Sequence, residues 1–108
     1  MNQWVIRYLP EAERDLARLN QSVRPEVLKG IRKVAQNPGH PDGYGKPLGN
    51  IAGSDLAGLY KIKFRKAGLR VVYGLEYRDG VMTIIIISAR ADNAVYEEAE
   101  RRRVKYDL

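Results

Sequence analysis

The chain has 108 residues, with 19 Lys and Arg against 13 Asp and Glu, and therefore a formal net charge of +6, which indicates one small basic domain spanning residues 1–108. It has no cysteine, which excludes a disulfide scaffold, a cysteine-ligated zinc or iron–sulfur site and a thiol nucleophile. No apolar run is long enough to span a bilayer, and the N-terminus lacks the features of a signal peptide, so we expect a soluble cytoplasmic protein.

The single histidine, His40, limits the kinds of catalysis that the chain could perform. It lies in the segment Asn37-Pro38-Gly39-His40-Pro41, which is typical of a surface loop. Ribonuclease chemistry that uses two histidines is therefore excluded, and a histidine triad or a zinc hydrolase site would need a better-placed imidazole. Any catalysis would depend on Lys, Arg, Tyr or carboxylate side chains, and we expect no metal or other cofactor.

The N-terminal third is predicted to form one strand and a helical hairpin. Residues 3–9 are rich in β-branched and aromatic side chains and end at Pro10, which indicates a strand. Pro10 suits the first turn of a helix, and apolar residues then recur at helical spacing. A second helix is expected over about residues 23–36, where Gly30 in the middle indicates a close packing contact.

The rest of the chain is predicted to form a long connection, three strands and a helix. Residues 37–58 hold six of the ten glycines and three of the five prolines, which favours a long connection. Strands are then expected over residues 59–65, 69–75 and 81–89, and a helix over residues 93–105. The run Ile84–Ile87 is apolar on both faces, which indicates a strand covered on both sides. The order β-α-α-β-β-β-α predicts an α+β fold, with a mainly antiparallel twisted sheet, the helical hairpin on one face and a C-terminal helix.

Alternation along the strand at residues 59–65 places three cations on one face. The next strand adds a fourth cation, and a fifth ends the Ile-rich strand, so all five could converge on one positive surface. These residues are Lys61, Lys63, Arg65, Arg70 and Arg90. Lysines can also protect an edge strand from aggregation, so a phosphate-binding site and a solvated face both remain open at this point.

The predicted C-terminal helix carries an aromatic side chain and several charges. Tyr96 could be a core residue, or it could stack on a base or share a proton beside the cations. Glu97–Arg101 and Glu98–Arg102 are acid–base pairs at i,i+4 spacing, which favours local stabilisation of the helix, with extra RNA affinity as a side effect. The candidate RNA-binding residues are Arg65, Lys66, Arg101 and Arg102.

Several segments of the chain, taken in order, resemble the RelE/ParE superfamily of bacterial toxins, and the RelE branch more closely. The resemblance covers about residues 3–100 and includes the helical hairpin, Lys46-Pro47-Leu48, Leu59–Arg65, Gly68–Tyr73 and the ending Arg90…Val95-Tyr96. It implies catalytic residues at Lys61, Lys63, Arg70, Arg90 and Tyr96. Family members that cut RNA by other routes often have a histidine near the last strand, and Ser88–Asp92 has none, which favours chemistry by lysine and arginine.

The resemblance implies the toxin of a type II toxin–antitoxin system, acting as a ribosome-dependent mRNA endonuclease that cuts in the A site by 2′-OH attack. The implied partners are a RelB-like antitoxin, the ribosome with its 16S rRNA, and mRNA, with operator DNA bound only by the toxin–antitoxin complex. We expect an acidic or amphipathic antitoxin segment that covers the cations or displaces the helix of Tyr96.

Roles for the five residues follow from the chemistry of RNA cleavage. Neighbouring cations lower the pKa of a lysine, so Lys63 is the predicted base. Lys61 and Arg70 would stabilise the transition state, Arg90 would bind phosphate or donate a proton, and Tyr96 would orient the nucleotide by stacking.

Three other interpretations of the sequence stay open. The chain could be a ParE-like inhibitor of gyrase, which would not need these five residues together. It could be a nucleic-acid-binding module without catalysis, or an inactive toxin that keeps only the fold.

Overall fold

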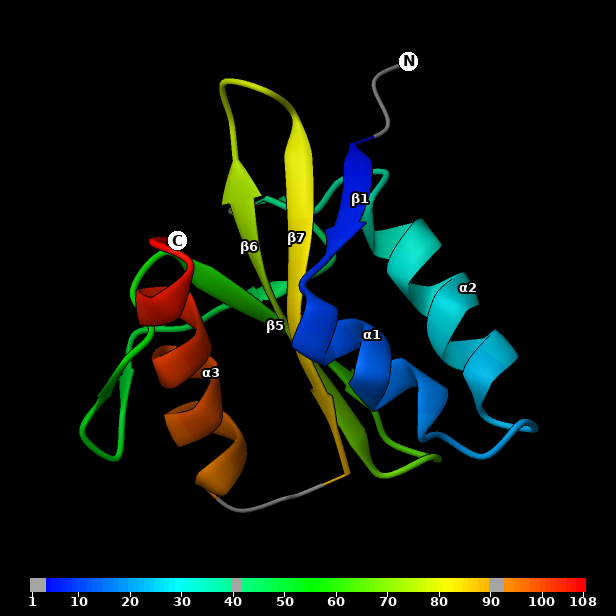
Figure 1. Ribbon diagram of the computed structural model, residues 1–108. Helices are drawn as coiled ribbons and strands as arrows, with labels where there is room; N and C mark the ends of the chain where they lie inside the picture. Colours follow the sequence, from blue (N-terminus) through cyan, green and yellow to red (C-terminus); the bar gives the residue numbers. More distant parts are fainter. Residues whose placement is uncertain (1–3, 40–41, 90–92) are drawn as a thin grey trace.

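The computed structural model describes residues 4–39, 42–89 and 93–108, and Figure 1 shows helices packed around a twisted sheet. In chain order the elements are β1 (Val5–Tyr8), α1 (Pro10–Ala17), α2 (Arg24–Val34), β2 (Lys46–Pro47), β3 (Asn50–Ile51), β4 (Ser54–Asp55), β5 (Leu59–Phe64), β6 (Leu69–Glu76), β7 (Val81–Ser88) and α3 (Ala94–Lys105). The order of the longer elements confirms the predicted α+β class. Among the described helices, none is both long and apolar enough to cross a membrane.

The main sheet has five strands in the order β1-β7-β6-β5-β2. β1 runs parallel to β7, whereas the other neighbouring pairs are antiparallel, which confirms a mainly antiparallel sheet. Short turns join β5 to β6 and β6 to β7, and such turns allow only antiparallel pairing. The parallel pair needs a long crossover, and the two N-terminal helices with the strands that follow them supply it.

The segment over residues 37–58 holds more structure than the sequence predicted. It contains β2, which joins the main sheet, and a small hairpin of β3 and β4. The hairpin turns at Ala52 and Gly53, which have positive φ angles of 50° and 87°, as tight hairpins require. Strands of two residues are too short to show alternation, so the sequence pattern could not reveal them. The prediction for His40 falls outside the described residues.

Helices cover both faces of the sheet at β7. In Figure 1, α1 and α2 lie on one side of β7 and α3 lies on the other. Gly30 of α2 faces the ring of Phe64 on β5, which a methyl group at that position would overlap, so the predicted close packing is confirmed. Residues 81–87 are buried, as the apolar run predicted for a strand covered on both sides.

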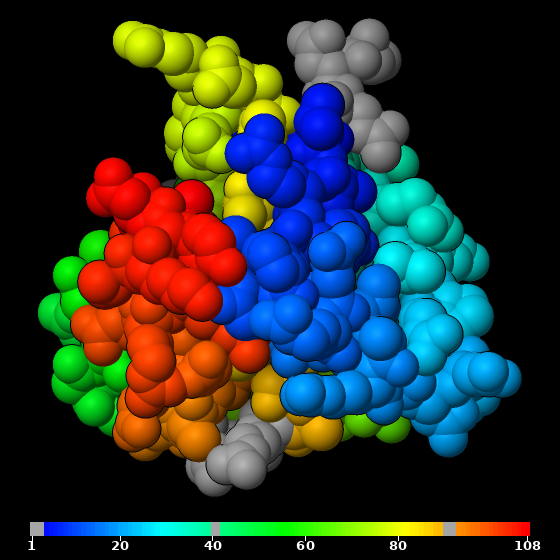
Figure 2. Space-filling view, viewed as in Figure 1, coloured from blue at the N-terminus to red at the C-terminus, as the bar shows by residue number. Residues whose placement is uncertain are grey.

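The outer edge of β7 is completed by side chains. Within the described residues, β1 pairs with β7 only over Val81–Ile84. Beyond that point, the carboxylate of Asp15 accepts a hydrogen bond from the Ile87 amide at 3.1 Å, and the Arg102 guanidinium donates to the Ile85 carbonyl at 2.9 Å. Asp15 and Arg102 also form an ion pair at 2.7 Å. This network joins α1 to α3, and Figure 2 shows the surfaces of these two regions in contact.

Candidate active site

Three of the predicted catalytic cations lie on one face of the sheet. The register between β5 and β6 places Lys63 directly opposite Arg70, and Lys61 lies two residues away on β5. Side chains two residues apart on a strand, or opposite across a pair, point to the same face. Phe64 points to the opposite face, where α2 lies. The three cations therefore lie on the face that α3 covers.

Tyr96 of α3 packs against two of these cations. Its ring centroid lies 6.0 Å from Nζ of Lys61 and 5.9 Å from Cζ of Arg70, distances at which a cation is attracted to an aromatic face. Tyr96 is only 5% exposed, which confirms the core interpretation for the free chain. The structure thus brings Tyr96 together with Lys61, Lys63 and Arg70, whereas Arg90 falls outside the described residues.

Two residues that the sequence did not single out for the site, Tyr44 and Lys46, lie beside these cations. Lys46 on β2 is the direct partner of Lys61 on β5. A groove of about 230 Å³ beside β5 is lined by Tyr44, Lys46, Lys61, Ile62, Lys63 and Arg65, and we call it the edge groove. Lys46 lies in a segment that carries the family resemblance, but neither that resemblance nor the glycine-rich composition around it indicated the register with β5.

Neighbouring charges and burial lower the pKa of the two central lysines. We call Lys46, Lys61, Lys63, Arg65 and Arg70 the cation cluster. The pKa of Lys63 is lowered first by the charge of Lys61, then by partial desolvation and by the charges of Arg70, Lys46 and Arg65. The pKa of Lys61 is lowered first by burial and then by Arg70 and Lys46. In the part of the chain that the structure describes, no carboxylate lies within 4.0 Å of the charged nitrogens of Lys46, Lys61, Lys63 or Arg65. Lys46, Lys61, Lys63 and Arg65 can therefore bind an anion.

The remaining predicted RNA-binding residues lie in different surroundings. Lys66 is exposed in the turn between β5 and β6. The exposed side chain of Arg101 forms an ion pair with Glu98 at i,i+3 spacing, and not with Glu97 as predicted. The predicted pair of Glu98 with Arg102 is present at 3.0 Å.

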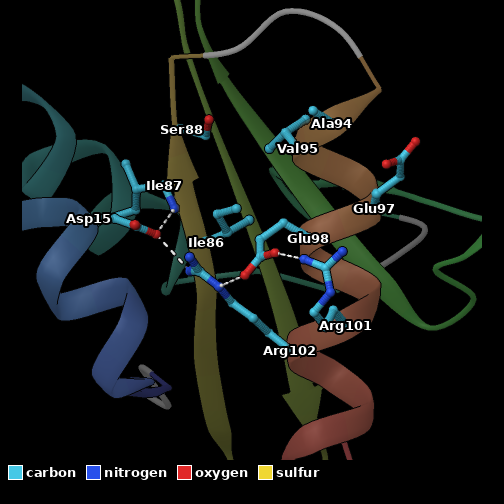
Figure 3. Close-up of a pocket in the computed structure, with 10 residues that line it drawn as sticks. All are labelled: Asp15, Ile86, Ile87, Ser88, Ala94, Val95, Glu97, Glu98, Arg101 and Arg102. Atoms are coloured by element: carbon cyan, nitrogen blue, oxygen red, sulfur yellow. Dashed lines mark hydrogen bonds and ion pairs between the residues drawn. The ribbon is translucent and has the colours of Figure 1, made fainter.

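The guanidinium of Arg102 is turned inward. Its side chain is 12% exposed and pairs with Asp15 as well as Glu98. Figure 3 shows this network in a pocket of about 350 Å³ between β7 and the start of α3. Because these polar groups already bind one another, we assign the Arg102 guanidinium a structural role in the free chain.

A family model described as the ParE toxin of the type II toxin–antitoxin system parDE matches residues 6–94. The chain belongs to the RelE/ParE toxin superfamily. A putative RelE-like toxin protein of Escherichia coli is 22% identical over 93% of this chain and 97% of its own length. The mRNA interferase toxin RelE of E. coli K12 is 29% identical over 84% of this chain and 87% of that protein.

Solved RelE structures share the fold of this RelE-branch toxin. A free variant of E. coli RelE superposes with a TM-score of 0.74 at 25% identity, covering 98% of this chain and 99% of that one. Isolated E. coli RelE gives a TM-score of 0.65 at 25% identity, covering 97% of this chain and 99% of that one. The toxin–antitoxin complex RelBE2 of Mycobacterium tuberculosis gives a TM-score of 0.69 at 24% identity, covering 85% of this chain and 97% of that one. At this identity the likeness establishes a shared fold only.

Proposed function

We propose that this RelE-branch toxin is a ribosome-dependent mRNA endonuclease that cuts in the A site by attack of the RNA 2′-OH. The observation that carries the proposal is the meeting of Lys61, Lys63 and Arg70 with Tyr96 on one sheet face. A curated relative named mRNA interferase toxin RelE gives it further support. A dense positive face costs folding stability, and a bound polyanion would offset that cost.

The proposed reaction divides its work among the clustered side chains. The 2′ oxygen attacks the adjacent phosphorus while the bond from phosphorus to the 5′ oxygen breaks, giving a 2′,3′-cyclic phosphate and a 5′-hydroxyl. Lys63 takes the 2′ proton, which its lowered pKa favours. Lys61 and Arg70 stabilise the charge that develops on the phosphate oxygens. The family pattern places an arginine at Arg90, and we propose that it binds phosphate or donates the proton to the 5′ oxygen.

Tyr96 has a conditional role in this proposal. Its ring is buried against Lys61 and Arg70 in the free chain, so a base can stack on it only after α3 moves. We therefore propose that Tyr96 orients the nucleotide after such a movement, and that the ribosome supplies the positioning of mRNA that a shallow surface does not.

Single-turnover cleavage on programmed ribosomes tests the role of Lys63. Lys63→Ala should lower the rate about 100-fold or more, since general bases contribute about 10²–10⁴-fold. Lys63→Arg keeps the charge but cannot act as a base at neutral pH, so it should be nearly as slow. Lys29→Ala, which removes an exposed lysine of α2, is the matched control. A loss below about tenfold in Lys63→Ala would exclude Lys63 as the base, and rapid cutting of naked mRNA would contradict ribosome dependence.

The proposed partners include a RelB-like antitoxin. Complexes named as RelE or RelBE toxin–antitoxin assemblies, including the intact E. coli RelBE complex, share this fold. We propose that an acidic or amphipathic antitoxin segment covers the cation cluster or displaces α3, and that only the complex binds operator DNA. Protection of Lys61 and Lys63 from acetylation in the purified complex, but not in the free toxin, would support coverage of the cluster.

A second candidate function is inhibition of gyrase, because the matching family model carries the ParE description. Induction in growing cells separates the two functions: an mRNA endonuclease stops amino-acid incorporation first, whereas a gyrase inhibitor stops thymidine incorporation first. A binding module without catalysis differs from both, since each Lys→Ala or Arg→Ala change would weaken binding evenly and lower the salt slope by about one.

A further inference from the structure

Tyr44 is a large aromatic residue that remains 55% exposed on a firmly held segment. Its amide donates a hydrogen bond to the Asn37 carbonyl at 2.8 Å. The next residue, Gly45, lies so close to the Tyr73 hydroxyl that a methyl group there would overlap it. That hydroxyl in turn donates to the Pro38 carbonyl at 2.8 Å. The backbone below Tyr44 is therefore fixed, although its ring faces solvent.

The surroundings of the Tyr44 ring are cationic. Nζ of Lys33 lies 5.5 Å from the ring centroid, close enough for a cation–π contact. The ring also lines the edge groove together with Lys46, Lys63 and Arg65. The groove thus combines one exposed aromatic face with several cations, which is the combination that binds single-stranded nucleic acid: bases stack on the ring and cations neutralise the phosphates.

The edge groove is continuous with the proposed catalytic face because Lys61 and Lys63 belong to both. An RNA strand whose scissile phosphate lies at Lys63 would have its neighbouring nucleotide within the groove.

We propose that Tyr44 forms a nucleobase subsite, on which the base next to the scissile phosphate stacks while Lys46 and Arg65 neutralise the flanking phosphates. This inference rests on the proposed function and names a substrate contact for it. The subsite accepts any base, because every base has a π face, and it favours purines because they stack over a larger area.

Binding of an eight-nucleotide, fluorescein-labelled single-stranded RNA, followed by anisotropy, tests the subsite directly. The toxin carries Lys63→Arg, which keeps the positive charge in the groove but removes the proposed base and so any residual cleavage. A second RNA has abasic nucleotides in place of the central ones. Tyr44→Ala should weaken binding of the base-bearing RNA about 5- to 150-fold, the range that corresponds to loss of one stacked base. It should change binding of the abasic RNA less than about twofold, and Tyr44→Phe should bind both RNAs like the parent.

The matched control is Tyr77→Ala, which removes a tyrosine that is 64% exposed and lies outside the groove. It should bind both RNAs as the parent does. Equal losses for the two RNAs in Tyr44→Ala, or no preference of the parent for the base-bearing RNA, would overturn the subsite.

Cleavage on ribosomes then separates this inference from the proposed function. With Lys63 intact, Tyr44→Ala should reduce the advantage of a purine over a pyrimidine next to the cut. If wild-type toxin does not cut mRNA on ribosomes but Tyr44 still discriminates the two RNAs, the proposed function fails and the subsite stands. If wild-type toxin cuts mRNA on ribosomes but Tyr44→Ala binds the base-bearing and abasic RNAs with equal losses, the subsite fails and the proposed function stands.

Discussion

Removal of the Arg102 guanidinium should strongly destabilise the fold. Arg102 and Asp15 pair at 2.7 Å with side chains that are 12% and 10% exposed, and Arg102 also donates to the Ile85 carbonyl at 2.9 Å. Arg102→Ala leaves a shielded carboxylate without its counter-charge and a strand carbonyl without its donor. Breaking such a pair costs about 3–5 kcal/mol, and we take about 3 kcal/mol because both groups keep some contact with water.

That cost converts into a measurable shift of the melting temperature. An unfolding entropy of about 2.1 cal/mol/K per residue, over 108 residues, makes about 3 kcal/mol equivalent to a fall in Tm of about 13 °C. Thermal melts followed by far-UV circular dichroism measure the shift, and urea titration should give an unchanged m value, since the folded structure stays the same.

Arg101→Ala is the matched control for Arg102→Ala. Arg101 is the preceding residue on α3 and also pairs with Glu98, but its side chain is 70% exposed. An exposed pair of this kind contributes about 0.5 kcal/mol or less, so Tm should fall by only about 2 °C. If the two variants melt at the same temperature, the structural role assigned to Arg102 is wrong. If Arg102→Ala binds RNA more weakly under conditions in which the variant is fully folded, Arg102 contributes to RNA binding as well.

Three further predictions concern pH and packing. The pKa of Lys63 is lowered, mainly by the charge of Lys61. The cleavage rate should therefore rise with pH and reach its plateau below pH 10.5, the ordinary pKa of lysine. A rate that reaches its plateau only at pH 10.5 or above would contradict a lowered pKa of the base. Glu11 has a pKa lowered to about 2, first by its hydrogen bond from Lys105, so it stabilises the fold above about pH 4.5 and this stabilisation is lost as pH falls toward 2. Acid titration followed by circular dichroism should show a smaller loss of stability for Glu11→Gln than for wild type. Gly45→Ala should unfold the chain at lower urea concentration, whereas Gly49→Ala, which has open space around it, should be near neutral; equal midpoints would refute the overlap argument.

Strand alternation was sufficient to predict the central part of the candidate site. A period of two fixes which side chains share a face, and the short turn after residue 65 left little freedom in how Lys63 and Arg70 align. The groups around them could not be predicted in the same way. Lys46 reaches Lys61 through a two-residue strand, whose register depends on tertiary contacts and not on local pattern.

The role of Arg102 shows a different limit of sequence reasoning. Its spacing from Glu98 correctly predicted one ion pair. However, the pair with Asp15 joins residues that are 87 positions apart, and it exists because β1 is too short to cover the whole edge of β7. Non-local pairing of this kind leaves no periodic signal, so a buried structural arginine and a solvent-facing one have the same pattern in the sequence.

The positions of Lys61, Lys63 and Arg70 on two hydrogen-bonded strands bear on how codons would be distinguished. Hydrogen bonds between the strands fix in advance the backbone positions from which these three side chains extend, so no closing loop is needed to bring the three cations together. The nucleic acid must then bend to suit a rigid template. Under the proposed function, codons whose backbone adopts that bend at little energetic cost would be cut faster. The preference of the enzyme among codons would then arise from the bending energy of the RNA backbone.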